Sequence, residues 1–131
     1  MVFPEHYAAD ILFFFQEKPQ ELGVYQSLEI QMEALFPEAS IRVQKTQISF
    51  YGRHLFAAVS LPLRRRKAWP ECCVLATFGL GYRLESPWVA VAAESYPGRW
   101  THHVVLSREE EVDGELMSWI QEAYAFSQSK R

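Results

Sequence analysis

The chain has 131 residues, 49% of them hydrophobic and 15% aromatic, which is enough apolar material for the core of one domain spanning residues 1–131. The net charge is −3, and the apolar run ILFFF at 11–15 is too short to cross a membrane and lacks the basic leader and cleavage site of a signal peptide. The adjacent Cys72 and Cys73 offer no disulfide framework, so we expect a cytoplasmic protein with no membrane partner.

The first predicted elements are helices. Between Pro19 and Pro37, apolar side chains recur at spacings of three and four, which is typical of one buried helix face. These residues are Tyr25, Leu28, Met32, Leu35 and Phe36. The pattern predicts a helix that Pro37 ends, with a shorter helix before it.

The middle of the chain changes to short β-type runs separated by loops that contain Gly and Pro. The predicted strands cover residues 41–51, 55–61, 72–78, 88–93 and 101–106. Because the connections are short, successive strands should pair as antiparallel neighbours in a meander.

A last helix is predicted after these strands. Ser107 stands three residues before Glu110, the spacing of a capping box. A helical stripe follows at Leu116, Trp119, Ile120, Ala123 and Phe126 or Ser127. The expected fold class is therefore α+β. It consists of an antiparallel meander of about five strands, with N-terminal helices and a C-terminal helix packed on one face.

Charge is distributed unevenly along the chain. Residues 1–40 hold seven acidic side chains and one basic, whereas residues 41–106 hold nine basic and three acidic. In a meander the loops 62–71 and 94–100 would lie at the same end of the sheet as the start of the first strand. That end would gather Lys45, Arg64, Arg65, Arg66, Lys67, Trp69, Tyr96, Arg99 and Trp100.

A basic cluster among aromatic rings suggests an anionic ligand. Guanidinium groups bind phosphate or carboxylate in a bidentate fork, and exposed rings stack on bases. The first hypothesis is a non-enzymatic binding module for a nucleotide, a nucleic acid or an acidic partner. The candidate ligand-binding residues are Lys45, Arg64, Arg65, Trp69, Tyr96, Arg99, Trp100 and His102. The alternative is that RRRK is a solvated run, or that it faces the protein's own acidic helices.

Two adjacent histidines lie in the predicted strand 101–106. Side chains of adjacent strand residues point to opposite faces, so at most one of His102 and His103 serves a given site. A second hypothesis is an enzyme of unknown reaction, in which Lys45 stabilises an anion and one histidine carries a proton. A third is an interaction domain without a ligand site, which binds another protein or a second copy.

Motifs for specific chemistries are missing from the sequence. It contains no nucleophile elbow, no paired carboxylates and no phosphate-binding glycine loop, and GLGY at 79–82 has only a GxG without the helix of a dinucleotide site. No Cys or His residues have the spacing of a structural zinc site. We expect neither a cofactor nor a metal, and the question of catalysis stays open.

Four segments of the sequence resemble those of a known domain family. They are KTQISFYGRHLFAAVSLPLRRR (45–66), FGLGYRLESP (78–87), YPGRWTHHV (96–104) and ELMSWIQEAYAFS (115–127). Together they resemble a family of small bacterial domains of unknown function, over nearly the whole chain from the second helix onward. The resemblance implies no activity, cofactor or catalytic residue.

Overall fold

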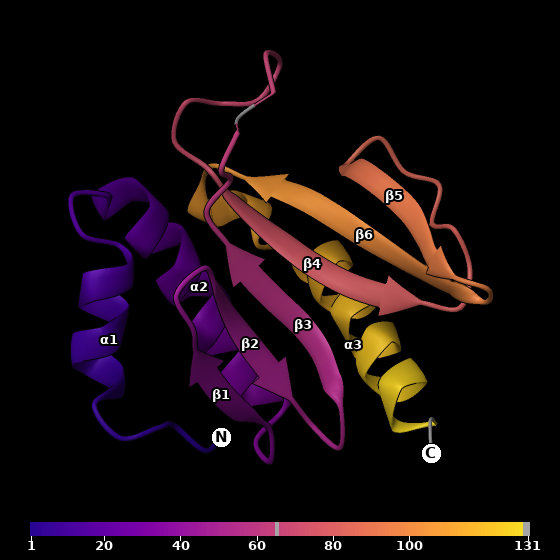
Figure 1. Cartoon of the computed structure of the whole chain (residues 1–131), viewed down its shortest axis with the longest axis horizontal. Coiled ribbons are helices and arrows are strands. Elements are labelled where there is room, and N and C mark those ends of the chain that lie inside the picture. The colour runs from indigo at the N-terminus through magenta and orange to yellow at the C-terminus, as the bar shows by residue number, and fades with distance from the viewer. Residues whose placement is uncertain (65, 130–131) are drawn as a thin grey trace.

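Figure 1 presents the computed structural model of the chain, in which residues 1–64 and 66–129 are described. Arg65, one of the predicted ligand-binding residues, lies outside the described residues. The helices are α1 (Tyr7–Phe14), α2 (Pro19–Leu35) and α3 (Gly114–Gln128), and a short 3-10 helix, η1 (Glu109–Glu111), precedes α3. Within the described part of the chain, no helix combines the length and the apolar character that a bilayer crossing needs.

The predicted helices are confirmed, with α2 as the longest. Pro19 is its first residue, a position where a missing backbone N–H costs no hydrogen bond. The helix ends at Leu35, shortly before Pro37. Its buried stripe includes Val24, Tyr25, Leu28 and Met32, which matches the predicted spacing. The predicted stripe is wrong at Leu35, which is 39% exposed, and Phe36 is buried just beyond the end of the helix.

The start of α3 differs from the predicted capping box. Asp113 is its N-cap, and the Asp113 carboxylate accepts the backbone N–H of Leu116 at 2.9 Å. The Glu111 carboxylate instead accepts the backbone N–H groups of Ser107 and Arg108, which closes the turn around η1. The acidic run after Ser107 therefore forms a separate turn, and the helix begins later.

The predicted antiparallel sheet is confirmed, with six strands. They are β1 (Ser40–Val43), β2 (Gln47–Tyr51), β3 (Leu55–Ser60), β4 (Val74–Leu80), β5 (Val89–Tyr96) and β6 (Arg99–Leu106). The predicted strand 41–51 is divided into β1 and β2 by a tight turn, in which the backbone N–H of Gln44 donates to the carbonyl of Gln47 at 2.9 Å. One predicted strand is thus a hairpin.

Strand order departs from a simple meander after β4. The order is β1-β2-β3-β4-β6-β5, so β6 lies between β4 and β5. Because β6 is antiparallel to both neighbours, β4 and β5 run in the same direction, and residues 81–88 must return along the sheet. The loop after β3 and the turn between β5 and β6 therefore lie at opposite ends of the sheet (Figure 1), not at one end as predicted.

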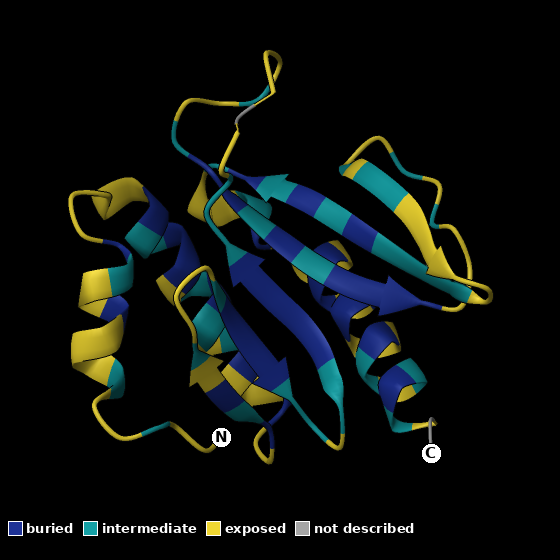
Figure 2. Ribbon diagram, in the orientation of Figure 1, coloured by how far each residue is buried: buried dark blue, intermediate teal, exposed yellow. Residues whose placement is uncertain are grey.

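The core lies between the sheet and the helices α2 and α3. Burial is greatest in β2, β3 and β4 and decreases toward β5 (Figure 2). Phe78 of β4 lies near Trp119 of α3, with ring centroids 6.2 Å apart. Phe56 packs against Phe36 and Tyr124, each with centroids 4.9 Å away. This apolar layer closes one face of the sheet.

Candidate functional site

The other face of the sheet is not covered by a helix in the described part of the chain (Figure 1), and we call it the open face. Strand register places one row of side chains across it from β1 to β6: Arg42, Ser49, Ala58, Thr77 and His103. The middle of this row consists of small side chains. Ser49 and Ala58 are nevertheless buried, and the side chains of Gln44 and Gln47 hydrogen-bond to the Ser49 hydroxyl.

Hydrogen-bonding groups occupy much of the open face. The Thr77 hydroxyl lies 2.8 Å from His103 Nδ1. The hydroxyls of Ser95 and Thr101 lie 2.5 Å apart. Ser49 donates its hydroxyl hydrogen to the Gln44 side-chain oxygen at 2.7 Å. The face therefore presents donors and acceptors, which suits a polar ligand.

Three arginines on this side of the molecule each lie over an aromatic ring. The pairs are Arg42 with Tyr51 at 4.6 Å, Arg66 with Trp69 at 5.5 Å and Arg99 with Tyr96 at 5.8 Å, measured from guanidinium carbon to ring centroid. Such contacts hold a guanidinium in place while leaving its charge available. Each pair thus presents a positioned cation.

The position of each pair follows from its neighbours. Arg42 pairs in register with Ser49 of the open-face row. The guanidinium of Arg99 lies over Gly79, where a Cβ atom would stand 2.9 Å from Arg99 Nε. This side chain therefore covers the sheet surface of β4, at the end where β4 finishes.

Arg66 lies close enough to His103 to affect its titration. Burial lowers the pKa of the His103 imidazole, and the charge of Arg66 lowers it further. His103 is half-buried, and its Nδ1 atom is hydrogen-bonded to the Thr77 hydroxyl. The pair Arg66 and Trp69 therefore lies beside the open-face row, at its β6 side.

These arginines are not neutralised by carboxylates in the part of the chain that the structure describes. The ion pairs there are His6 with Glu5 and Arg83 with Glu85. A guanidinium without a carboxylate partner keeps its full attraction for an external anion. The open face is thus an available basic surface.

The predicted basic end of the sheet does not form as one cluster. Lys45, in the turn between β1 and β2, is at the same end as the loop that holds Arg64 and Trp69. Tyr96 and Arg99 are at the opposite end, because β6 is inserted between β4 and β5. Lys45 is exposed and lines a groove of about 500 Å³ beside α1, away from the open-face row.

Trp100 lies on the helix-covered side. It is paired in register with the core residue Leu80, and the guanidinium of Arg83 lies 5.9 Å from its ring centroid. Trp100 therefore does not join the other predicted ligand residues on the open face.

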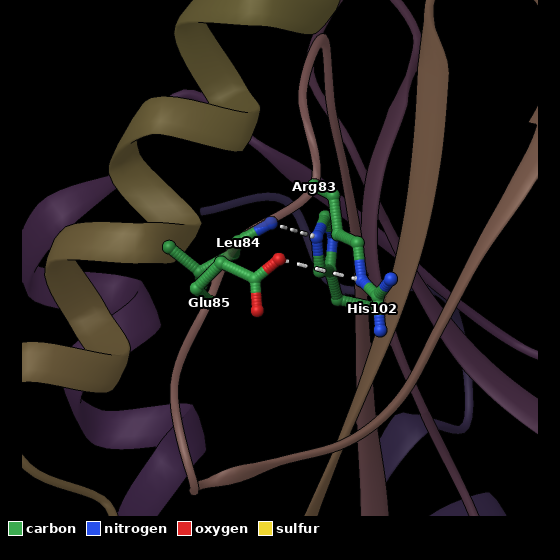
Figure 3. A network of polar contacts seen from close by, with 4 residues as sticks. All are labelled: Arg83, Leu84, Glu85 and His102. Atoms are coloured by element: carbon green, nitrogen blue, oxygen red, sulfur yellow. Dashed lines mark hydrogen bonds and ion pairs between the residues drawn. The ribbon is translucent and has the colours of Figure 1, made fainter.

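His102 belongs to the core and not to a ligand site. It has 0% exposure, and its ring stacks on Phe78 with centroids 5.3 Å apart. Residues 81–88, which return along the sheet from β4 to β5, form the crossover. Figure 3 shows Leu84 of this crossover, whose backbone N–H donates to His102 Nε2 at 2.9 Å. Burial lowers the pKa of this imidazole, so its neutral form is the acceptor of that bond. A ligand has no access to this fully buried side chain, so the structure gives no support to the prediction of His102 as a ligand-binding residue.

The crossover that carries Leu84 is held between the sheet and α3. The Tyr82 hydroxyl donates to the Glu122 carboxylate of α3 at 2.8 Å, and Gly81 lies against the ring of Phe126. Because His102 accepts a bond from this segment, it fixes the path by which the chain reaches β5.

Metal ligands do not gather in the described residues, where no three His, Cys, Asp or Glu side chains come together around one point. Comparison with known proteins gives one match: residues 14–127 fit the model of a domain of unknown function, DUF5655. The chain belongs to this family. Neither the curated proteins nor the solved structures contain a match.

Membership in DUF5655 brings no established activity to this chain, so its function must be argued from the open face. Sequence reasoning missed Arg42 and Thr77 as candidate residues, although Arg42 is exposed and Thr77 is partly exposed in their strands. Alternation places each on one of two faces, but only the pairing of strands shows that they share a face with His103.

Proposed function

We propose that this DUF5655 domain is a non-enzymatic binding module for an anionic ligand, and that the ligand lies on the open face of the sheet. The observation that carries the proposal is the set of three arginines, each positioned on an aromatic ring and free of a carboxylate partner among the described residues. A ligand site needs fixed cations, and ring contacts fix these without neutralising them.

The distribution of charge supports this location. Most acidic residues of the N-terminal third lie in α1, α2 and their flanks, whereas the strands and their loops carry most of the basic residues. The acidic residues of α1 and α2 therefore lie on elements other than the strands and the loop that carry the three arginine pairs. An anion would be steered toward the open face even though the net charge is −3.

The surface between the arginines also suits an anion. Small side chains leave a hollow of about 30 Å³ beside Arg99, lined by Thr77 and Thr101 and otherwise mostly by apolar residues of β3 and β4. Hydroxyl groups there donate hydrogen bonds to phosphate or carboxylate oxygens. The proposed ligand would therefore meet charge at its ends and neutral donors between them.

A second candidate function, that of an enzyme acting on the open face, is favoured by one contact. The Thr77 hydroxyl lies 2.8 Å from His103 Nδ1, which is the separation of a nucleophile and its base. Lys45 lies on the β1–β2 turn, and β2 and β6 are separated by three inter-strand spacings, roughly 14 Å. An enzyme on this face would therefore use His103 with Arg66 and not with Lys45.

The test of the binding proposal is intrinsic tryptophan fluorescence during titration with inorganic polyphosphate at low and moderate salt. Trp69 lies against Arg66, so a ligand at Arg66 should change its emission. We expect saturable quenching that weakens with salt and weakens again in Arg66→Ala and Arg99→Ala.

The matched control is Arg83→Ala, because Arg83 also lies over a tryptophan but on the helix-covered side. It should leave the titration unchanged. The same titration followed by calorimetry covers a ligand that binds without changing emission. No heat and no quenching with polyphosphate would overturn the proposal.

A further inference from the structure

We infer that the anion is a single strand of nucleic acid that crosses the open face from β1 to β6. This inference rests on the proposed function and adds the class of the ligand. It depends on the distances between the arginines and on the aromatic ring that lies beside each of them.

The spacing of the arginines requires a long ligand. Arg42 is on β1, whereas the guanidinium of Arg99 lies over Gly79 of β4, so the strand order puts three inter-strand spacings between β1 and the strand under this guanidinium, roughly 14 Å. One phosphate group cannot contact both guanidinium groups over this distance. A ligand that uses all three arginine pairs must therefore be an extended polyanion.

The aromatic rings distinguish a nucleic acid from other polyanions. Each arginine is accompanied by a ring, and Tyr96 is 51% exposed while Tyr51 and Trp69 are partly exposed. A ring that contacts a guanidinium on one side can stack on a base with its other side. Polyphosphate and acidic peptides have regular charges but no matching series of flat groups. Alternating phosphates and bases fit alternating arginines and rings.

The shape of the face favours a single strand over a duplex. Base edges in a B-form duplex are reached through the major groove by an inserted helix or β-ribbon. The described helices lie on the other side of the sheet, so none is available for insertion here (Figure 1). A sheet surface with rings instead offers a platform for unstacked bases, as other sheet-based binders of single strands do.

The hydroxyl-lined centre supplies contacts of the right kind between the arginines. Thr77, Thr101 and Ser95 present neutral groups that can bond base edges or sugar hydroxyls. Because these groups are small and uncharged, they would add little sequence selectivity. We therefore expect binding that depends on strand length and salt more than on sequence.

The experiment uses fluorescence anisotropy of end-labelled oligouridylate and oligothymidylate with the full chain. A twelve-nucleotide strand lies within the range of about 4–16 nucleotides seen for single-strand sites and should bind, whereas a dinucleotide should bind at least tenfold more weakly. The dependence of log Kd on log salt should have a slope of about 2, from three phosphate contacts at about 0.7 each.

The variants Arg42→Ala, Arg66→Ala and Arg99→Ala should each lower that slope by about 0.7 and weaken binding roughly five- to tenfold. Tyr51→Leu and Tyr96→Leu should weaken binding while leaving the slope unchanged, because they remove stacking and not charge. Arg83→Ala is the control and should change neither quantity. Circular dichroism of each variant verifies that the fold is retained.

Other outcomes separate the two proposals. Binding of polyphosphate without binding of either oligonucleotide would overturn the single-strand inference and leave the anion-binding proposal standing. A dinucleotide that binds as tightly as the twelve-nucleotide strand would also overturn the inference, as would a duplex that binds equally well. Failure of every polyanion would overturn both.

Discussion

His102 and His103 are neighbours in one strand, yet they belong to two different regions of the molecule. His102 is fully buried between Phe78 and the crossover, where it accepts a backbone N–H from Leu84. His103 lies on the open face beside Thr77 and Arg66. The same side-chain type thus serves the core at one position and a polar surface at the next.

The comparison teaches that the two faces of this sheet have separate roles. Phe78 of β4, which is paired with His102, is apolar and packed near Trp119 of α3, so it holds the fold together. Thr77 of β4, which is paired with His103, is a hydrogen-bonding residue, and no helix in the described chain limits access to it. Substitutions on the first face should change stability, and those on the second should change binding.

The largest expected effect comes from comparing the neighbours Phe78 and Thr77. Phe78→Ala should lower the free energy of unfolding by about 3–5 kcal/mol, because it leaves a cavity beneath α3. Thr77→Ala should lower it by less than about 1 kcal/mol, since Thr77 is a small side chain that is only partly buried. Urea unfolding measures both, and equal losses would mean that the faces are not distinct.

The histidines provide the next test. His102→Ala should cost about 2–4 kcal/mol, because it opens a cavity and leaves the backbone N–H of Leu84 without its acceptor. His103→Ala should cost less than about 1 kcal/mol, because its side chain is only partly buried. Chemical denaturation with both variants in parallel measures this difference. A larger loss in His103→Ala would reverse the assignment of the two residues.

Much of this fold was predictable from the sequence, because local patterns specify it. The helix over 19–35 follows from apolar spacing and two prolines. The statement that adjacent histidines face opposite sides follows from strand geometry alone, and the structure confirms it. What alternation leaves open is which histidine is buried, since that depends on which face α3 covers.

The position of the basic residues was not predictable, because it depends on strand order. Sequence spacing favours pairing of successive strands, but β6 pairs with β4 and leaves β5 at the edge. This exchange places Arg99 at the opposite end of the sheet from Arg64. It also gives Arg42 a place on the same face as His103, which no local pattern contains.

Stability should depend on pH through the same histidines. Burial is the main cause that lowers the pKa of each imidazole below its usual value near 6.5. Below that pH the unfolded chain binds more protons than the folded one, so the free energy of unfolding should decrease as pH falls from about 6.5 toward the folded pKa values. Urea titrations at pH 7.5 and pH 5 measure the loss. His102→Gln should reduce it, and a wild-type stability that does not change over this interval would contradict the prediction.

A smaller effect is expected at Gly79, which lies under Arg99. A Cβ atom there would stand 2.9 Å from Arg99 Nε and Nη2, so Gly79→Ala should displace a flexible side chain without removing its charge. Stability should change by less than about 1 kcal/mol, whereas polyphosphate affinity should fall about two- to threefold in calorimetry. Gly23→Ala is the control, since open space surrounds this helical glycine. It should stabilise the chain slightly and leave affinity unchanged.

The finest test asks whether the two faces are electrostatically separate. The pKa of His103 is lowered by burial and by Arg66, whereas that of His102 is lowered mainly by burial and also by the charges of His103 and Arg83. Arg66→Ala should therefore raise the pKa of His103, and Arg83→Ala should raise the pKa of His102, in NMR titrations of the imidazole protons. Because a more fully protonated His103 opposes protonation of His102, the Arg66 variant should not raise the pKa of His102. If either variant raised both values equally, the sheet would not separate the two regions, and an anion bound to the open face would also perturb the buried histidine.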